Sequence, residues 1–108
     1  MEAVDFRRFF YLKHLNIMKE LEESFIGKGE VKGFIFTQIK KSDYAYVYKV
    51  DNGFSVNYEV FFRKENTQFN CISYPSSKAF GVWAWSCTEH TYLDKFEELD
   101  ERRINSLK

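Results

Sequence analysis

The sequence predicts an α+β fold in a single domain over residues 1–108, with an N-terminal helix, an antiparallel meander of about five strands and a C-terminal helix. The chain has 108 residues, of which 44% are hydrophobic and 19% aromatic, which is enough for one core. Residues 4–25 have helical periodicity, residues 31–88 have short alternating runs with turn signals between them, and residues 92–106 are helical again. Both helices are expected on one face of the sheet.

The first helix is expected over residues 4–25. At 100° per residue most of its apolar side chains fall on one half of the helical wheel, and Gly27 follows where the helix should end. His14 lies in the apolar half. We interpret it as a histidine packed at an interface rather than as a catalytic group.

The middle of the chain is expected to form the sheet, because aromatic and β-branched residues dominate it. Trp83 and Trp85 are two residues apart, so in a strand they share one face. We expect both rings to fill the core against the first helix, and the alternative is that they stack on bases or a sugar ring. The expected strands lie near 31–39, 44–50, 54–63, 67–74 and 80–87.

The last helix is expected over 92–106. Thr91 and Asp94 have the Thr-x-x-Asp spacing of a capping box, in which side chains accept hydrogen bonds from backbone N–H groups of the first turn. Phe96 and Leu99 follow at helical spacing and should face the sheet.

The hairpin in residues 44–63 decides which side chains face the core. Asn52-Gly53 is typical of a two-residue type I′ turn, which places Asp51 opposite Phe54. Every second residue from there on is apolar, whereas the residues between include polar ones, so the apolar row is assigned to the core. That row contains Phe54, Val56, Tyr58, Val60 and Phe62, opposite Lys49, Val47 and Ala45.

The other face of the hairpin then carries a tyrosine strip that faces solvent. A similar tight turn at Lys41-Ser42 places Phe36 in the core row and Ile35 beside the tyrosines. Two interpretations stay open: the rings only shield the sheet, or the strip is a contact surface. The candidate partner-binding residues are Tyr44, Tyr46, Tyr48, Phe61, Arg63, Lys40 and Lys41.

Constellations for catalysis or metal binding are weak. Cys87, His90 and Cys71 supply suitable residue types, but a zinc site needs about four ligands and the fourth would be the distant His14. Cys87 with His90 has the groups for an activated thiolate without a third group to orient them. No phosphate loop or dinucleotide glycine pattern is present. We expect no metal, no cofactor and no enzymatic activity.

Formal net charge is zero, which gives no long-range attraction to nucleic acid. The start "MEAVDFRRFF" lacks the pattern of an export signal, and no apolar stretch approaches the roughly 20 residues of a membrane span. Two cysteines and no export signal indicate a cytoplasmic protein with free thiols.

These traits favour a small non-enzymatic protein-interaction or regulatory module that binds through the tyrosine strip. Its partner would be another protein or a second copy of the chain, and an inhibitor or adaptor from a phage or mobile element would have such traits. The alternative is a single-stranded nucleic-acid-binding protein, in which the tyrosines stack on bases and the flanking Lys and Arg side chains contact phosphates.

Overall fold

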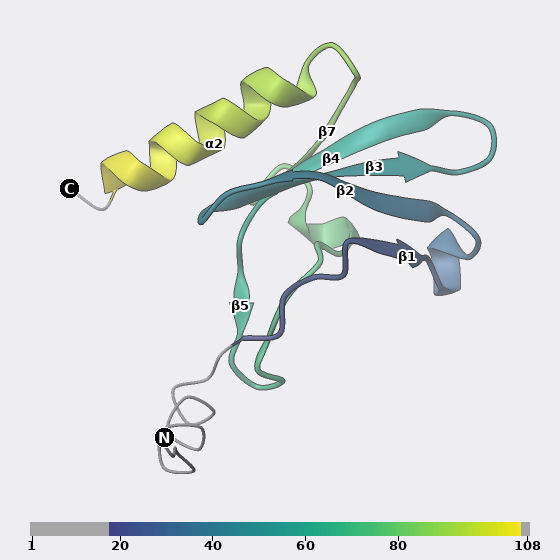
Figure 1. Cartoon of the computed structure of the whole chain (residues 1–108), viewed down its shortest axis with the longest axis horizontal. Coiled ribbons are helices and arrows are strands. Elements are labelled where there is room, and N and C mark those ends of the chain that lie inside the picture. The colour runs from purple at the N-terminus through teal and green to yellow at the C-terminus, as the bar shows by residue number, and fades with distance from the viewer. Residues whose placement is uncertain (1–17, 107–108) are drawn as a thin grey trace, which may run out of the picture. The chain divides into compact units, whose positions relative to one another are not determined.

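The computed structural model describes residues 18–106, with side chains described as far as residue 102 (Figure 1). These residues form two compact units, one of residues 22–63 and 74–106 and one of residues 18–21 and 64–73. The larger unit holds a five-stranded antiparallel sheet, in the order β1-β2-β3-β4-β7, and one α-helix. Its elements are β1 (Ser24–Ile26), η1 (Gly29–Val31), β2 (Ile35–Lys41), β3 (Ala45–Asp51), β4 (Val56–Phe62), η2 (Ser77–Ala79), β7 (Ala84–Cys87) and α2 (Tyr92–Ser106).

The smaller unit contains the two-stranded pair β5 (Glu65–Asn66) and β6 (Cys71–Ile72). The backbone of Lys19 joins it, donating to Asn70 O at 3.0 Å and accepting from Ile72 N at 2.9 Å. Asn70 has a left-handed φ of 57°, which asparagine tolerates in tight turns. The strand predicted over 67–74 is therefore wrong over most of its length, because only Cys71–Ile72 is strand and half of the segment is the turn between β5 and β6.

The pairing of β3 with β4 differs from the predicted register by two residues. Asp51 pairs with Val56, whereas a two-residue turn would place it opposite Phe54. Because side chains alternate with a period of two, a shift of two residues leaves each one on its predicted face. The assignment of faces within this hairpin is confirmed, although the turn that predicted it is wrong.

The longer loop forms because local side chains accept its backbone N–H groups. Asn52 Oδ1 accepts hydrogen bonds from Phe54 N and Ser55 N, both at 2.8 Å, and Asp51 Oδ1 accepts from Gly53 N at 2.8 Å. Gly53 has a φ of 94°, a conformation that favours glycine. These bonds hold a four-residue loop where the Asn-Gly pair alone favours a two-residue turn.

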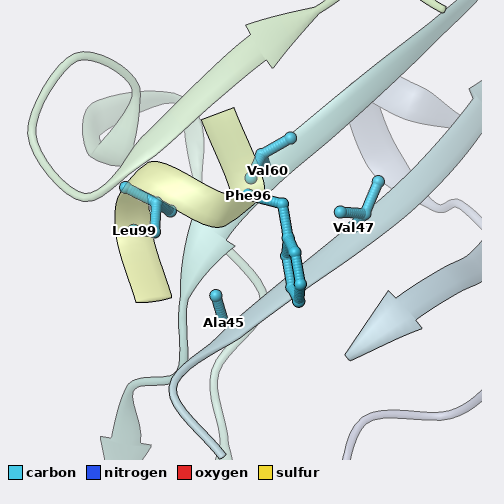
Figure 2. Packing of buried hydrophobic residues seen from close by; sticks show 5 residues of the cluster. All are labelled: Ala45, Val47, Val60, Phe96 and Leu99. Carbon is cyan, nitrogen blue, oxygen red and sulfur yellow. The ribbon is translucent and has the colours of Figure 1, made fainter. Parts of the chain in front are cut away.

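The predicted core row is confirmed in its middle, which packs under α2, but not at its start: Phe54 lies outside β4 and is 98% exposed, and Val56 is 44% exposed. Ala45, Val47 and Val60 of the sheet meet Phe96 and Leu99 of the helix, and all five are buried (Figure 2). The alternation of apolar residues along β3 and β4 and the helical spacing in α2 predict this layer.

The cap of α2 lies one turn earlier than predicted. Thr88 Oγ1 accepts a hydrogen bond from His90 N at 3.2 Å, and Thr91 Oγ1 accepts from Thr88 N at 2.9 Å. This arrangement is similar to a capping box, but Thr88 binds the second N–H group after it and not the third, and the turn it holds precedes α2, which begins at Tyr92. The predicted pair of Thr91 with Asp94 is replaced by Thr88 with Thr91.

The predicted N-terminal helix is wrong where the structure describes it. Residues 18–25 include a backbone bridge at Lys19 and most of strand β1. Gln38 N donates to Glu23 O at 2.7 Å, and Gly27 N donates to Phe34 O at 2.8 Å, so pairing with β2 overrides helix propensity here. Residues 4–17 of the predicted helix, His14 included, lie outside the described residues.

The fold class is therefore corrected to a five-stranded antiparallel sheet with one helix, α2, on one face, over the residues described. Within residues 18–106 no helix is both long and apolar enough to cross a membrane. That the whole chain, 1–108, forms one domain stays a prediction.

Candidate functional site

The tyrosine face of the sheet is a second core and not an exposed strip. Tyr46, Tyr48 and Phe61 are each 0% exposed. The ring of Phe61 stacks on Tyr46 at a centroid distance of 5.6 Å and on Tyr48 at 5.8 Å. The predicted exposure of these three residues is wrong.

Side chains from outside the hairpin cover this face. The ring of Tyr74, which lies between β6 and η2, packs at a steep angle against four others: Phe25 at 5.5 Å, Phe36 at 5.3 Å, Tyr48 at 5.2 Å and Phe61 at 4.9 Å. Phe25 and Phe36 stack on each other at 4.7 Å. Edge-to-face and stacked ring pairs at these distances are favourable, so the cover is a packed aromatic cluster.

Phe36 reaches this cluster because of a β-bulge in β2. We call the face that packs under α2 the α2 face, and the face that carries Tyr46, Tyr48 and Phe61 the aromatic face. After the bulge Lys40 pairs with Val47 on the α2 face, but before the bulge Phe36 pairs with Val50 on the aromatic face. The extra residue, Ile39, reverses which face the preceding residues occupy. The prediction that Phe36 joins the row under the helix is therefore wrong, and Ile35 lies on the α2 face instead of beside the tyrosines.

The buried tyrosine hydroxyls all have hydrogen-bond partners. Tyr48 Oη donates to Glu22 O at 2.5 Å and accepts from Gln38 Nε2 at 2.9 Å. Tyr46 Oη accepts from Arg63 Nη1 at 2.9 Å. A phenol can be buried at little cost when its hydroxyl is satisfied, which explains how tyrosines fill a core position here.

The seven predicted binding residues do not share one surface. Arg63 is half-buried against Tyr46, Tyr44 is half-buried, and Lys40 lies over the ring of Phe96 at 5.5 Å, on the α2 side. Lys41 is exposed and pairs with Tyr46 in the β2–β3 register. The three central rings, of Tyr46, Tyr48 and Phe61, are buried, so their faces are not open for a base to stack on.

The two tryptophans lie on opposite faces. Trp83 meets Phe61 edge-on at 6.2 Å on the aromatic face, whereas Trp85 meets Phe62 at 6.1 Å and lies under Lys95 of α2 at 5.0 Å. The shared face was predicted from strand alternation, but β7 begins only at Ala84 and Trp83 precedes it in a turn.

A hollow opens beside the aromatic cluster, and it is the candidate site. It has a volume of about 790 Å³. Its wall is mostly apolar and contains the rings of Phe25, Phe34, Phe36, Tyr74 and Phe80. We call it the aromatic hollow. Its polar lining comes from residues of η1, β4, η2 and β7 and their neighbours: Glu22, Lys28, Glu30, Asn57, Glu59, Ser76, Ser77 and Ser86.

Gly27 allows one wall of the hollow to form. A Cβ atom added there would lie 2.3 Å from Val31 O and 2.9 Å from the Phe36 ring, both far inside contact distance. Gly27 O also accepts a hydrogen bond from Gly33 N at 3.2 Å. The absence of a side chain therefore lets residues 28–33 fold back onto β2 beside the hollow.

Glu59 brings a half-buried carboxylate to the aromatic wall. Its Oε1 accepts a hydrogen bond from Tyr74 Oη at 2.6 Å. Burial raises the pKa of the Glu59 carboxyl above its ordinary value, and the hydrogen bond from Tyr74 lowers it in part. Burial, together with the charge of Glu59, raises the pKa of the Tyr74 hydroxyl. Asn57 Nδ2 donates to Ser86 Oγ at 3.0 Å on the same wall.

The cysteine candidates do not assemble into a reactive site. Burial raises the pKa of the Cys87 thiol, which opposes formation of a thiolate, although a hydrogen bond with Thr91 lowers it in part. Cys71 and Cys87 are free thiols, and His90 is exposed. Among residues 18–102, no three His, Cys, Asp or Glu side chains are grouped to hold a metal ion.

No protein-family model, curated protein or solved structure matches this chain. The choice of the aromatic hollow as the candidate site therefore depends on its geometry alone. Sequence reasoning missed Tyr74, which reads as the end of a strand, and took Glu59 for an ordinary solvent-facing residue. One signal was available: Glu59 lies on the same face of the sheet as Tyr46, Tyr48 and Phe61, so it is a charged residue among aromatic ones.

Proposed function

We propose that this chain is a small non-enzymatic ligand-binding module of regulatory type, and that the aromatic hollow is its binding site. The observation that carries the proposal is a half-buried carboxylate, Glu59, set in a wall of aromatic rings around a space of about 790 Å³. Pockets for small organic molecules have volumes of roughly 300–1,000 Å³ and combine an apolar wall with a few polar groups.

The wall is held in place before any ligand arrives. Phe25 and Phe36 are stacked, and Tyr74 is held by its ring contacts and by its bond to Glu59. A binding site whose side chains are already ordered loses little conformational entropy on binding. We place the module in the cytoplasm, where free thiols such as those of Cys71 and Cys87 persist.

The test is an NMR titration of the ¹⁵N-labelled protein with a library of small aromatic and aliphatic molecules. We expect ligands to shift backbone amides around the hollow, with saturable curves. Ser77→Trp should abolish these shifts, because Ser77 lines the hollow and a large ring there would fill it.

Lys78→Trp is the matched control. Lys78 is the next residue of η2 and is also exposed, but it does not line the hollow. Binding that survives Lys78→Trp and is lost in Ser77→Trp supports the proposal. Shifts scattered over the surface, or equal binding by both variants, would contradict it.

A second candidate function, contact with a protein partner or a second copy, is favoured by exposed apolar side chains on the α2 face. Ile26 pairs with Ile35, and Ile35 with Asp51, which pairs with Val56, so these residues form one row across the sheet. Ile26 is 65%, Ile35 48% and Val56 44% exposed, and Phe54 in the adjoining loop is 98% exposed. Exposed apolar patches of this kind often mark protein contacts.

Sedimentation velocity over a range of concentrations tests self-association through this row. A dimer that dissociates in an Ile35→Ser, Phe54→Ser double variant would support it. A monomer at every concentration would rule out a homodimer and leave only a different protein as the partner.

A further inference from the structure

The charges around the aromatic hollow are unbalanced. Its lining contains three carboxylates, of Glu22, Glu30 and Glu59, and one ammonium group, of Lys28. Glu22, Glu30 and Lys28 are exposed, so water screens their charges, whereas Glu59 is half-buried among rings. The hollow thus presents a net negative potential with its least screened charge on the aromatic wall.

The Glu59 carboxylate is oriented but only partly satisfied. Its Oε1 accepts the hydrogen bond from Tyr74, whereas Oε2 has no hydrogen-bond partner in the part of the chain that the structure describes. An ionised carboxylate accepts several hydrogen bonds, and Oε2 is not a fully buried atom, so a donor that enters the hollow can reach it.

We propose that the aromatic hollow binds a small organic ammonium ion with an aromatic or alkyl body, and that Glu59 is its counter-ion. This inference rests on the proposed function, since it names the chemical class of the ligand. The ammonium group donates to Glu59 Oε2, and the apolar body lies against the rings of Phe25 and Phe36. Aromatic faces also attract cations, so the ring wall favours the same ligand.

Other ligand classes fit less well. An anion would meet three carboxylates and one lysine. A neutral alcohol can donate one hydrogen bond to Glu59, but it brings no positive charge to balance the half-buried carboxylate. A charge-assisted hydrogen bond is roughly twice as strong as a neutral one, so an ammonium ion gains the most from this carboxylate.

Three probes of similar size separate these classes: 2-phenylethylammonium, 2-phenylethanol and phenylacetate. NMR titration at neutral pH and low salt gives both the affinity and the location of each. We expect the ammonium ion to bind most tightly, with shifts at the amides of Glu59, Tyr74 and Phe36. The alcohol should bind more weakly at the same place, and phenylacetate should not bind.

Variants then test whether Glu59 is the carboxylate that binds the ammonium ion. Glu59→Gln keeps the shape of the side chain and should weaken binding of the ammonium ion about 10- to 100-fold, the loss expected for a hydrogen bond to a charged group. It should change the affinity of the alcohol by less than about threefold, because that ligand forms no ion pair. Glu30→Gln is the matched control, since it removes an exposed carboxylate from the same lining and should have a much smaller effect.

The outcomes separate the two proposals. Equal binding of alcohol and ammonium ion at the hollow, unchanged by Glu59→Gln, would overturn the ligand class and leave the binding module standing. If the ammonium ion shifted amides near exposed carboxylates and Glu59→Gln had no effect, the proposed ligand class would also be overturned. No binding by any of the three probes at millimolar concentration would count against the hollow as a ligand site and so against both proposals.

Discussion

The centres of both faces of the sheet are buried, but they are covered in different ways. On one face Ala45, Val47 and Val60 are aliphatic or small, and a regular helix packs on them through Phe96 and Leu99 (Figure 2). On the other face large rings predominate, and most of their cover comes from a short edge strand, a bulged strand and irregular segments. A helix fills the space above a sheet evenly, whereas loops and rings leave an aromatic hollow of about 790 Å³.

This contrast between the two faces indicates where a binding site can form in so small a chain. The α2 face is held mainly by apolar packing, and its centre is what sequence alternation predicts. The aromatic face uses tyrosines, whose hydroxyls bind backbone and side-chain partners around its rim. Polar groups and rings together give a surface that can both hold the fold and select a ligand.

The largest expected effect tests whether the aromatic face is a core at all. Val60 and Phe61 are neighbours in β4, both fully buried, and they point to opposite faces. Phe61→Ala should lower the free energy of unfolding by about 3–5 kcal/mol, and Val60→Ala by about 2 kcal/mol, because each leaves a cavity in its own core. Urea denaturation measures both. A loss below about 0.5 kcal/mol for Phe61→Ala would show that this ring lies in solvent.

The next effect distinguishes tyrosine hydroxyls that stabilise the fold by hydrogen bonding from those that do not. Tyr48→Phe should lower the free energy of unfolding by about 1–3 kcal/mol, because the Glu22 carbonyl loses its donor and Gln38 its acceptor. Tyr58→Phe is the control on the α2 face: its ring stacks on Tyr92 at 4.6 Å, and stacking does not need the hydroxyl. Equal losses in the two variants would contradict the distinction between the faces.

A smaller effect concerns how α2 is held on its face. Ser42 Oγ donates to Asp100 Oδ1 at 2.5 Å and accepts from the backbone N–H groups of Tyr44 and Ala45, both at 3.1 Å. Ser42→Ala should therefore cost about 1 kcal/mol, and hydrogen exchange of α2 amides should quicken. Ser24→Ala, at an exposed position of β1, should leave both unchanged. No change in α2 exchange would mean that packing alone holds the helix.

The sequence predicts the centre of the α2 face because its signals there are local and agree with one another. Alternation along β4 and helical spacing in residues 92–106 each point to the same layer, and both are observed. The hairpin prediction succeeds for a weaker reason. The loop is two residues longer than the Asn-Gly turn implies. Each side chain stays on its predicted face only because the register shift is an even number of residues.

The aromatic face could not be predicted in the same way, because its structure depends on contacts between distant segments. Tyr46 and Tyr48 alternate with Ala45 and Val47, and tyrosine is common on exposed strand surfaces, so no local signal shows that they are buried. A single extra residue, Ile39, moves Phe36 to this face. In β1, pairing with β2 overrides the helix propensity of the preceding residues. Glu59 becomes unusual only once Tyr74 covers it.

The smallest effect, and the only stabilising one, comes from this carboxylate. A carboxyl whose pKa is raised in the folded state stabilises that state below its unfolded pKa of about 4.3, and the contribution is lost as pH rises through the folded pKa. Glu59→Gln removes the titration and keeps an oxygen that accepts from Tyr74. The variant should therefore match the wild type near pH 4 and be the more stable protein at pH 7, as measured by urea denaturation at both pH values.

A gain in stability at pH 7 from Glu59→Gln would mean that the Glu59 carboxylate destabilises the folded protein there. A residue kept at a cost to stability is expected at a binding site, and no such residue is found among Ala45, Val47 and Val60 under α2. A saturating organic ammonium ion should narrow or reverse the gap at pH 7, because it stabilises only the folded wild type in which Glu59 is ionised. A wild type that is already more stable than Glu59→Gln at pH 7, without any ligand, would show that the carboxylate has a stabilising partner, and the case for a ligand cation would fail.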